Sequence, residues 1–205
     1  MRNRVIASIL LLGLALPQAG CWLGTHDLSG RNIYSRRIDV AYQRSGGTVP
    51  VAGASAAIVS VDAMDGRTVD RDRVGAVRND FGYELGVITA TNDIPQTVGT
   101  AVEQELRTRG FQIGAGHATI SIEVVRFYDD FRNEGLSWSA DATVKLSVTV
   151  RNPAKSIVFT KHYEGVDNES STYAQGALIK AFQIAVNSVV SDKALQAALF
   201  AAQQP

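Results

Sequence analysis

A single long alternation of apolar and polar residues does most to restrict how this chain can fold. From Trp138 to Val150 every second residue is apolar, whereas the residues between them are Ser, Thr, Asp or Lys. Because successive side chains of a strand point to opposite faces, this segment predicts a strand with one buried face and one face in water. An alternation of this length is typical of an antiparallel sheet that is covered on one side only.

Neighbouring segments are predicted to extend this sheet. Ile120–Val125 alternates in the same manner, and Ile157–Gly165 is the predicted antiparallel partner of the long strand across a turn-rich loop at Arg151–Lys155. Shorter strands are predicted earlier in the chain, at Ala57–Val61, Arg73–Arg78 and Glu84–Thr89.

Two helices complete the predicted domain. Asp93 is a favourable N-cap, with Pro95 in the first turn and Gly110 after the last, so a helix is predicted between them. A second, longer helix is predicted over Thr172–Ala202, with an interruption at Ser191-Asp192. The predicted fold class is therefore α+β: a single domain in which two helices pack on one face of a mainly antiparallel sheet.

The first twenty residues have the composition of a secretory signal peptide. Arg2 and Arg4 precede an apolar run, Val5–Leu16, which is shorter than the roughly 20 residues that a membrane-spanning helix needs. Small residues then lead to Cys21, the only cysteine in the chain. This arrangement resembles the lipobox of bacterial lipoproteins, which implies that the thiol is lipidated, although Gln18 stands where an aliphatic residue is usual. The alternative is a cleaved signal peptide with an incidental cysteine.

These observations divide the chain into a signal peptide (1–20), a lipidated N-terminus with a flexible tether (21–53) and an α+β domain (54–205). The tether is rich in Gly, Ser, Arg and Asn, and a short strand at Ile38–Tyr42 is compatible with its pattern. Trp22 replaces the Asp that retains lipoproteins in the inner membrane. The resemblance to bacterial lipoproteins therefore implies an N-terminal lipid anchor in the outer membrane, with the domain on its periplasmic face.

Several segments of the domain resemble the YajG family of uncharacterised bacterial lipoproteins. These segments are Val61–Arg67, Val74-Gly75, Val102–Phe111, Ala142–Val150 and Ala185–Val190. The resemblance extends over Ala56–Leu195 and implies a lipoprotein with a small α+β domain, without implying an enzymatic activity. Fold likeness alone does not supply a function.

Composition and motifs give little support to catalysis, cofactor binding or nucleic-acid binding. Basic and acidic residues number 20 each, so the net charge is zero and the basic surface that nucleic acids require is absent. The histidines His26, His117 and His162 have no metal-ligand partner at a suitable spacing. Asp80-Phe81-Gly82 matches the metal-binding triplet of protein kinases, but no other kinase motif accompanies it. We expect no catalytic site, no metal site and no cofactor.

The densest charged stretch contains one candidate recognition loop. Asp62, Asp65 and Arg67 lie at the end of a predicted strand, where the arginine could bind a carboxylate or phosphate through two parallel hydrogen bonds. The alternative is a solvated loop whose internal Asp–Arg pairs fix its shape. Asp129-Asp130, with Glu134, matches no Ca²⁺ loop and is predicted to lie at a hairpin tip.

Aromatic residues form a second candidate site. Phe127, Tyr128, Phe131 and Trp138 cluster around the same predicted hairpin. Part of such a set is normally core, and the exposed members would form an interface or a lipid-facing patch.

Three functions are compatible with the sequence. The first is a non-catalytic envelope lipoprotein, an interaction or assembly module that docks to another envelope protein. The second is a binding module for a lipid or other amphipathic ligand between sheet and helices, where Ala140 and Ala142 leave room. The third is a hydrolase, which a strongly perturbed acid or base in a cleft would support. An unprotected sheet edge favours the first function, and an enclosed apolar pocket favours the second.

Overall fold

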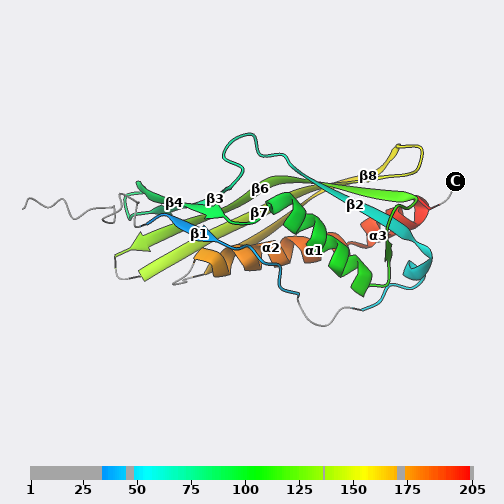
Figure 1. The fold of residues 1–205 in the computed structure, drawn as a ribbon. Coiled ribbons are helices and arrows are strands. Elements are labelled where there is room, and N and C mark those ends of the chain that lie inside the picture. The colour runs from blue at the N-terminus through cyan, green and yellow to red at the C-terminus, as the bar shows by residue number, and fades with distance from the viewer. Residues whose placement is uncertain (1–33, 45–48, 136, 170–173, 204–205) are drawn as a thin grey trace, which may run out of the picture.

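Helices lie against one face of a twisted sheet of eight strands (Figure 1). The computed structural model describes residues 34–44, 49–135, 137–169 and 174–203. The predicted signal peptide, Cys21 and the first part of the predicted tether lie outside these residues. The α+β class that the sequence predicts is confirmed.

Three long antiparallel strands form one side of the sheet, with β8 at its edge. They are β6 (Ala118–Glu134), β7 (Ser137–Arg151) and β8 (Ile157–Glu169), and β7 pairs with β6 on one side and with β8 on the other. The alternation along β7 is confirmed, because its apolar positions from Ala140 to Val150 are fully buried while the positions between them are exposed or half-buried.

The second edge of β6 pairs with two parallel strands in succession. β2 (Ile58–Asp65) pairs with the first part of β6, and β3 (Arg73–Arg78) pairs with its last part. The sheet continues from β3 to antiparallel β4 (Glu84–Ala90) and then to parallel β1 (Arg36–Ile38), while β5 (Gln112–Ile113) runs parallel to β2. The sheet is therefore mixed rather than mainly antiparallel, because the crossover through the first helix returns β6 alongside β2 in the same direction.

A β-bulge divides β6 at the point where its neighbour changes. Val124 pairs with Leu146 and Arg126 pairs with Lys145, so Val125 is an extra residue on β6. Val125 and Arg126 both face away from the helices, and both are exposed. The alternation of buried residues therefore moves from even to odd numbers after the bulge.

The first helix, α1 (Ile94–Thr108), begins where the sequence predicts. The Asp93 side chain accepts a hydrogen bond from the Gln96 amide at 2.8 Å, and Pro95 occupies the first turn. After the helix, Gly110 has a φ of 98°, a backbone conformation that glycine adopts at little cost.

The predicted C-terminal helix is two helices, so the expectation of two helices in the domain is wrong. α2 (Ala174–Ser191) and α3 (Lys193–Ala201) are separated by Asp192, whose backbone is extended. The Asp192 carboxylate accepts the Ala194 amide at 2.7 Å and caps α3. The break coincides with the interruption predicted at Ser191-Asp192.

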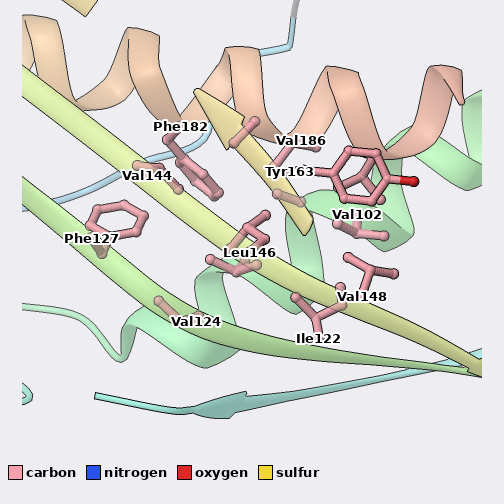
Figure 2. Close-up of a cluster of buried hydrophobic side chains, with 14 of the residues drawn as sticks. Val102, Ile122, Val124, Phe127, Val144, Leu146, Val148, Tyr163, Phe182 and Val186 are labelled. Carbon is pink, nitrogen blue, oxygen red and sulfur yellow. The ribbon is translucent and has the colours of Figure 1, made fainter. Parts of the chain in front are cut away.

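The main core lies between the sheet and α1 and α2 (Figure 2). Phe127 of β6 packs edge-to-face on Phe182 of α2, with 5.4 Å between ring centroids. At Gly165 of β8 the approach is closer still: a Cβ there would lie 2.0 Å from the Ala181 carbonyl oxygen of α2. The backbone of α2 therefore rests directly on β8, and the sheet–helix interface has no space for a ligand at that point.

Part of the predicted tether belongs to the sheet. β1 begins two residues before the strand considered at Ile38–Tyr42, and Ile38 and Val40 are buried. The Val40 amide donates to the Asn92 side chain at 3.0 Å, which ties this segment to the start of α1. A 3₁₀ turn at Ala54–Ala56 then leads into β2.

Candidate functional site

Arg67 of the candidate recognition loop is engaged within the loop itself. Its guanidinium donates to both carboxylate oxygens of Asp65, at 2.8 and 2.7 Å, and also to the backbone oxygens of Arg71 and Arg73. The side chains of Asp65 and Arg67 are only 8% and 10% exposed. Hydrogen bonding from Arg67 lowers the pKa of Asp65. This geometry matches the interpretation in which internal ion pairs fix the shape of the loop.

Asp62 does not join this pair. It lies three residues before Asp65 on β2, opposite Ser121 of β6, and therefore on the other face of the sheet. Asp62 is exposed on the face without helices, whereas Asp65 lines an open groove of about 680 Å³ beside the start of α1. The three residues of the candidate loop therefore lie on two different faces of the sheet.

A second cavity lies beside the segment of β6 that pairs with neither β2 nor β3. This cavity has a volume of about 420 Å³ and is lined in part by Arg73, Val125, Arg126 and Tyr128. The Arg73 guanidinium bonds Glu84 and the Tyr128 hydroxyl, and the Arg126 guanidinium lies 5.1 Å from the Tyr128 ring centroid. This cavity is open to solvent. Arg73 and Arg126 flank the ring of Tyr128, an arrangement that stabilises the position of this tyrosine.

The four candidate aromatic residues do not form one exposed patch. Phe127 and Phe131 are buried on the face of the sheet that carries the helices, whereas Tyr128 lies on the opposite face. Trp138 is half-buried and stacks on Phe131, with centroids 4.9 Å apart and Arg36 above the Phe131 ring. The bulge at Val125 explains this division, because it fixes which residues of β6 face the core.

Asp129 is the residue whose environment the sequence analysis missed. It lies within β6 rather than at a hairpin tip, it is fully buried, and neither carboxylate oxygen has a hydrogen-bond partner among the described residues. Burial, followed by the nearby carboxylates of Asp130, Asp141 and Asp167, raises the pKa of Asp129 from 3.8 to about 7.

The alternation before the bulge would place Asp129 outside the core, so a local pattern could not have found it. Its neighbour Asp130 faces the other side of the sheet and bonds Arg78 at 2.8 Å. Asp167 lies on the same face as Asp129, across Ala142 of β7, and pairs with Lys180 of α2 at 3.1 Å. Two carboxylates thus flank the small residue Ala142, in the region where the sequence suggested room for a ligand.

The described residues offer little to catalysis or metal binding. Among them, no group of three or more His, Cys, Asp or Glu side chains is placed to hold a metal ion. His117 lies near the backbone oxygen of Gln203, His162 is exposed on β8, and His26 lies outside the described part of the chain. Asp129 has the perturbed pKa that a general acid or base needs, but it does not line any of four well-formed cavities on the described surface.

The longest strand edge without a partner strand in the described part of the sheet is the outer edge of β8. β8 has 13 residues, and no described strand pairs with the side facing away from β7. Val158 and Val166 are 41% and 42% exposed on its solvent-facing side. Lys161 and Asp167 of β8, which lie on the face toward the helices, are paired within the chain with Asp192 and Lys180.

No helix in the described ranges has both the length and the apolar character required to cross a membrane.

A family model described as "Uncharacterized lipoprotein" matches residues 48–199. This match agrees with the resemblance to the YajG family that the sequence segments show. No curated protein matches the chain.

One of the solved structures similar to this chain shares its fold. A crystal structure of a Xanthomonas campestris protein assigned to the family model DUF330 superposes with a TM-score of 0.56 and 17% sequence identity, covering 82% of this chain and 97% of that chain. A minor lipoprotein from Acinetobacter baumannii gives a TM-score of 0.41 and 6% identity, covering 68% of this chain and 92% of that chain.

Proposed function

The chain belongs to this family of uncharacterised lipoproteins, and from that premise we propose that it is a non-catalytic, lipid-anchored protein of the cell envelope that docks to another envelope protein. The proposed anchor is Cys21, which directly follows a signal-peptide pattern and is the only cysteine. Trp22 supports a final position on the periplasmic face of the outer membrane.

The observation that carries the docking proposal is the free edge of β8. A sheet edge presents unpaired backbone N–H and C=O groups, which an extended segment of a partner can pair with as an additional strand. Thirteen residues are long enough for several such hydrogen bonds. The exposed Val158 and Val166 would add apolar contacts on the solvent-facing side of the added strand.

The direction of the backbone groups identifies the residues that would pair with the partner. The Val124 oxygen accepts the Gly66 amide on the β2 side, so inward-facing residues of β6 direct their peptide groups toward β2. When this alternation is carried across antiparallel β7, the outward-facing residues of β8, such as His162, have their peptide groups on the free edge. The peptide groups of Tyr163 point to β7 instead.

The alternative of a ligand between sheet and helices receives less support from the packing. α2 rests on Gly165, and Phe127 and Phe182 fill the adjacent space. Ala142 is flanked by buried carboxylates rather than by an apolar cavity.

Site-specific photo-crosslinking in intact cells tests the docking proposal. A photoreactive phenylalanine analogue at Val166, on the free edge side of β8, should crosslink to a defined envelope protein, whereas the same analogue at Gln104 on α1 should not. The substitution His162→Pro should abolish the crosslink, because it removes an edge N–H while leaving the pairing with β7 intact.

His162→Ala is the matched control, since it retains the N–H and should retain the crosslink. A thermal unfolding curve for His162→Pro close to that of His162→Ala shows that the domain is folded. Equal crosslinking in the Pro and Ala variants, or no specific product from Val166, would overturn strand addition at β8.

A further inference from the structure

The tip of the β3–β4 hairpin presents two aromatic rings to solvent. Phe81 and Tyr83 are 83% and 71% exposed, and they belong to the segment Asn79–Tyr83 that joins the two strands. Large exposed apolar side chains that lie close together indicate an interaction surface rather than a solvated loop.

The backbone of this tip is firmly built. The Asn79 side-chain oxygen accepts the amides of Phe81 and Tyr83, at 3.1 and 2.9 Å, and the Asn79 amide donates to the Tyr83 carbonyl at 3.0 Å. Gly82 supplies the left-handed conformation that the turn requires, with a φ of 80°. The exposed rings are therefore held by an ordered turn that directs them outward.

The described chain begins at the same end of the molecule. A Cβ on Gly86 of β4 would lie 2.6 Å from the carbonyl carbon of Tyr34, and the Val87 amide donates to the Ser35 hydroxyl at 3.3 Å. Gly86 is three residues from Tyr83, or roughly 10 Å along the strand. Figure 1 shows β1 and the β3–β4 hairpin together at the end of the molecule farthest from α3.

The position of Cys21 in the sequence limits how far the anchor can lie from this end. Thirteen peptide steps separate Cys21 from Tyr34. A fully extended chain spans at most about 3.5 Å per residue, so the lipidated cysteine lies within about 45 Å of Tyr34. An anchor at Cys21 would therefore be connected to the domain at this end rather than at the end with α3.

We propose that the hairpin tip Asn79–Tyr83 inserts Phe81 and Tyr83 into the headgroup region of the lipid bilayer that holds the anchor. The inference rests on the proposed lipidation of Cys21. Tyrosine suits the boundary between water and hydrocarbon, because its ring is apolar and its hydroxyl is polar, and phenylalanine gains from leaving water. The acyl chains give attachment, and the tip gives the domain a fixed orientation on the membrane.

Charge does not drive this contact. Arg78 and Arg132 flank the tip, and both pair with Asp130, at 2.8 and 3.1 Å. Asp80 within the tip is exposed and carries the opposite sign. Because the local charges are balanced, insertion of the rings should be nearly independent of salt.

A spin label beside the rings tests the proposal in the full-length lipidated protein. Since Cys21 carries the acyl chains, Asp80→Cys provides a single free thiol for a nitroxide and leaves both rings in place. In vesicles of phosphatidylethanolamine and phosphatidylglycerol at a ratio of about three to one, this label should be more accessible to oxygen, which concentrates in lipid, than to an aqueous nickel chelate. A label at Ala154→Cys, in the β7–β8 turn at the opposite end of the molecule, should show the aqueous pattern.

Replacing both rings with serine in the Asp80→Cys background should return the label to the aqueous pattern. Each lost ring should also weaken the membrane contact of the tip about ten-fold, which corresponds to the transfer of one large apolar side chain. The matched control is Val69→Ser, which removes an equally exposed apolar side chain outside the tip and should leave the label in lipid.

Flotation of the vesicles separates the two proposals. Protein that fails to float with the vesicles contradicts anchoring at Cys21. Protein that floats while the Asp80→Cys label remains aqueous overturns insertion of the tip but leaves the anchor standing. Shielding of the label only after envelope proteins are added would also overturn insertion, because the tip would then bind a protein.

Discussion

The two halves of β6 show how one strand can obey a sequence pattern and then depart from it. Before the bulge, residues 118, 120, 122 and 124 face the helices, and all four are apolar. After the bulge, the inward positions are Phe127, Asp129 and Phe131, so a carboxylate is placed in the core. The first half pairs with β2 and the second with β3.

The difference shows that the extra residue, rather than the composition, decides what is buried. Tyr128 and Asp130 would face the helices if the alternation from Ile120 to Val124 continued without a bulge. The bulge instead buries Phe127 and Phe131 against α2 and Trp138, at the cost of burying Asp129 between them. The two halves should therefore respond differently to deletions, truncations and pH.

The largest expected effect comes from deleting one residue of β7. Deletion of Thr143 reverses the faces of every residue on one side of it, so the loss should exceed about 5 kcal/mol and abolish cooperative unfolding. Deletion of Val125 removes only the extra residue of β6 and keeps each inward side chain inward, so the domain should remain folded with a loss below about 3 kcal/mol. Thermal unfolding followed by circular dichroism distinguishes the two. Equal disruption by both deletions would show that the bulge is indispensable for the fold itself.

Truncation in the first half of β6 should be the next most damaging change. Ile122 is fully buried, so Ile122→Ala should cost about 2–5 kcal/mol through lost apolar contact and the cavity that remains. Val125→Ala, on the exposed side of the same strand, should change the free energy of unfolding by no more than about 0.5 kcal/mol. Urea denaturation measures both. A cost for Ile122→Ala near that of Val125→Ala would contradict the assignment of the inward face.

Asp129 gives the second half of β6 a distinctive pH dependence. Its pKa is about 7 in the folded protein and 3.8 as the ordinary value, so the folded state binds the extra proton between these pH values. Stability should consequently be higher near pH 4 and fall as the pH rises to 7, by at most about 4 kcal/mol. Asp129→Asn should remove this slope and be more stable than the wild type at pH 8. A wild-type stability that is flat from pH 4 to 7 would show that Asp129 is ionised with a partner.

Asp192, which bonds Lys161 and Tyr163 of β8, should show the smallest effect on stability, and its pH dependence should have the opposite sign to that of Asp129. The hydrogen bond from Lys161 lowers the pKa of Asp192 to about 2, so its contribution is present above pH 4 and is lost as the pH falls toward 2. Asp192→Asn keeps the cap on α3 but weakens the bonds to Lys161 and Tyr163, and solvent screening limits the cost to about 1 kcal/mol at neutral pH. Denaturation at pH 7 and pH 2.5 measures it. An equal cost at both pH values would show that the charge is irrelevant.

Local chemistry predicted much of this fold. The alternation in β7 gave its buried face, and Asp93, Pro95 and Gly110 gave the limits of α1, because these effects act over a few neighbouring residues. The sequence predicted an interruption of the helix at Asp192, although it did not predict that one helix ends there and another begins. Of the candidate recognition loop, the pairing of Asp65 with Arg67 was among the alternatives, since the two are adjacent in the sequence.

The sequence by itself determined the α+β class, the strand alternation and the exceptional position of Cys21, since each depends on short-range order. The tertiary structure decided the parallel partners of β6, the separation of Asp62 from Arg67, the burial of Asp129 and the shared end of Tyr34 and Phe81. These features depend on segments far apart in the chain, and one extra residue at Val125 moves every later side chain of β6 to the other face. A periodic pattern carries no record of such an insertion until the partner strand fixes the register.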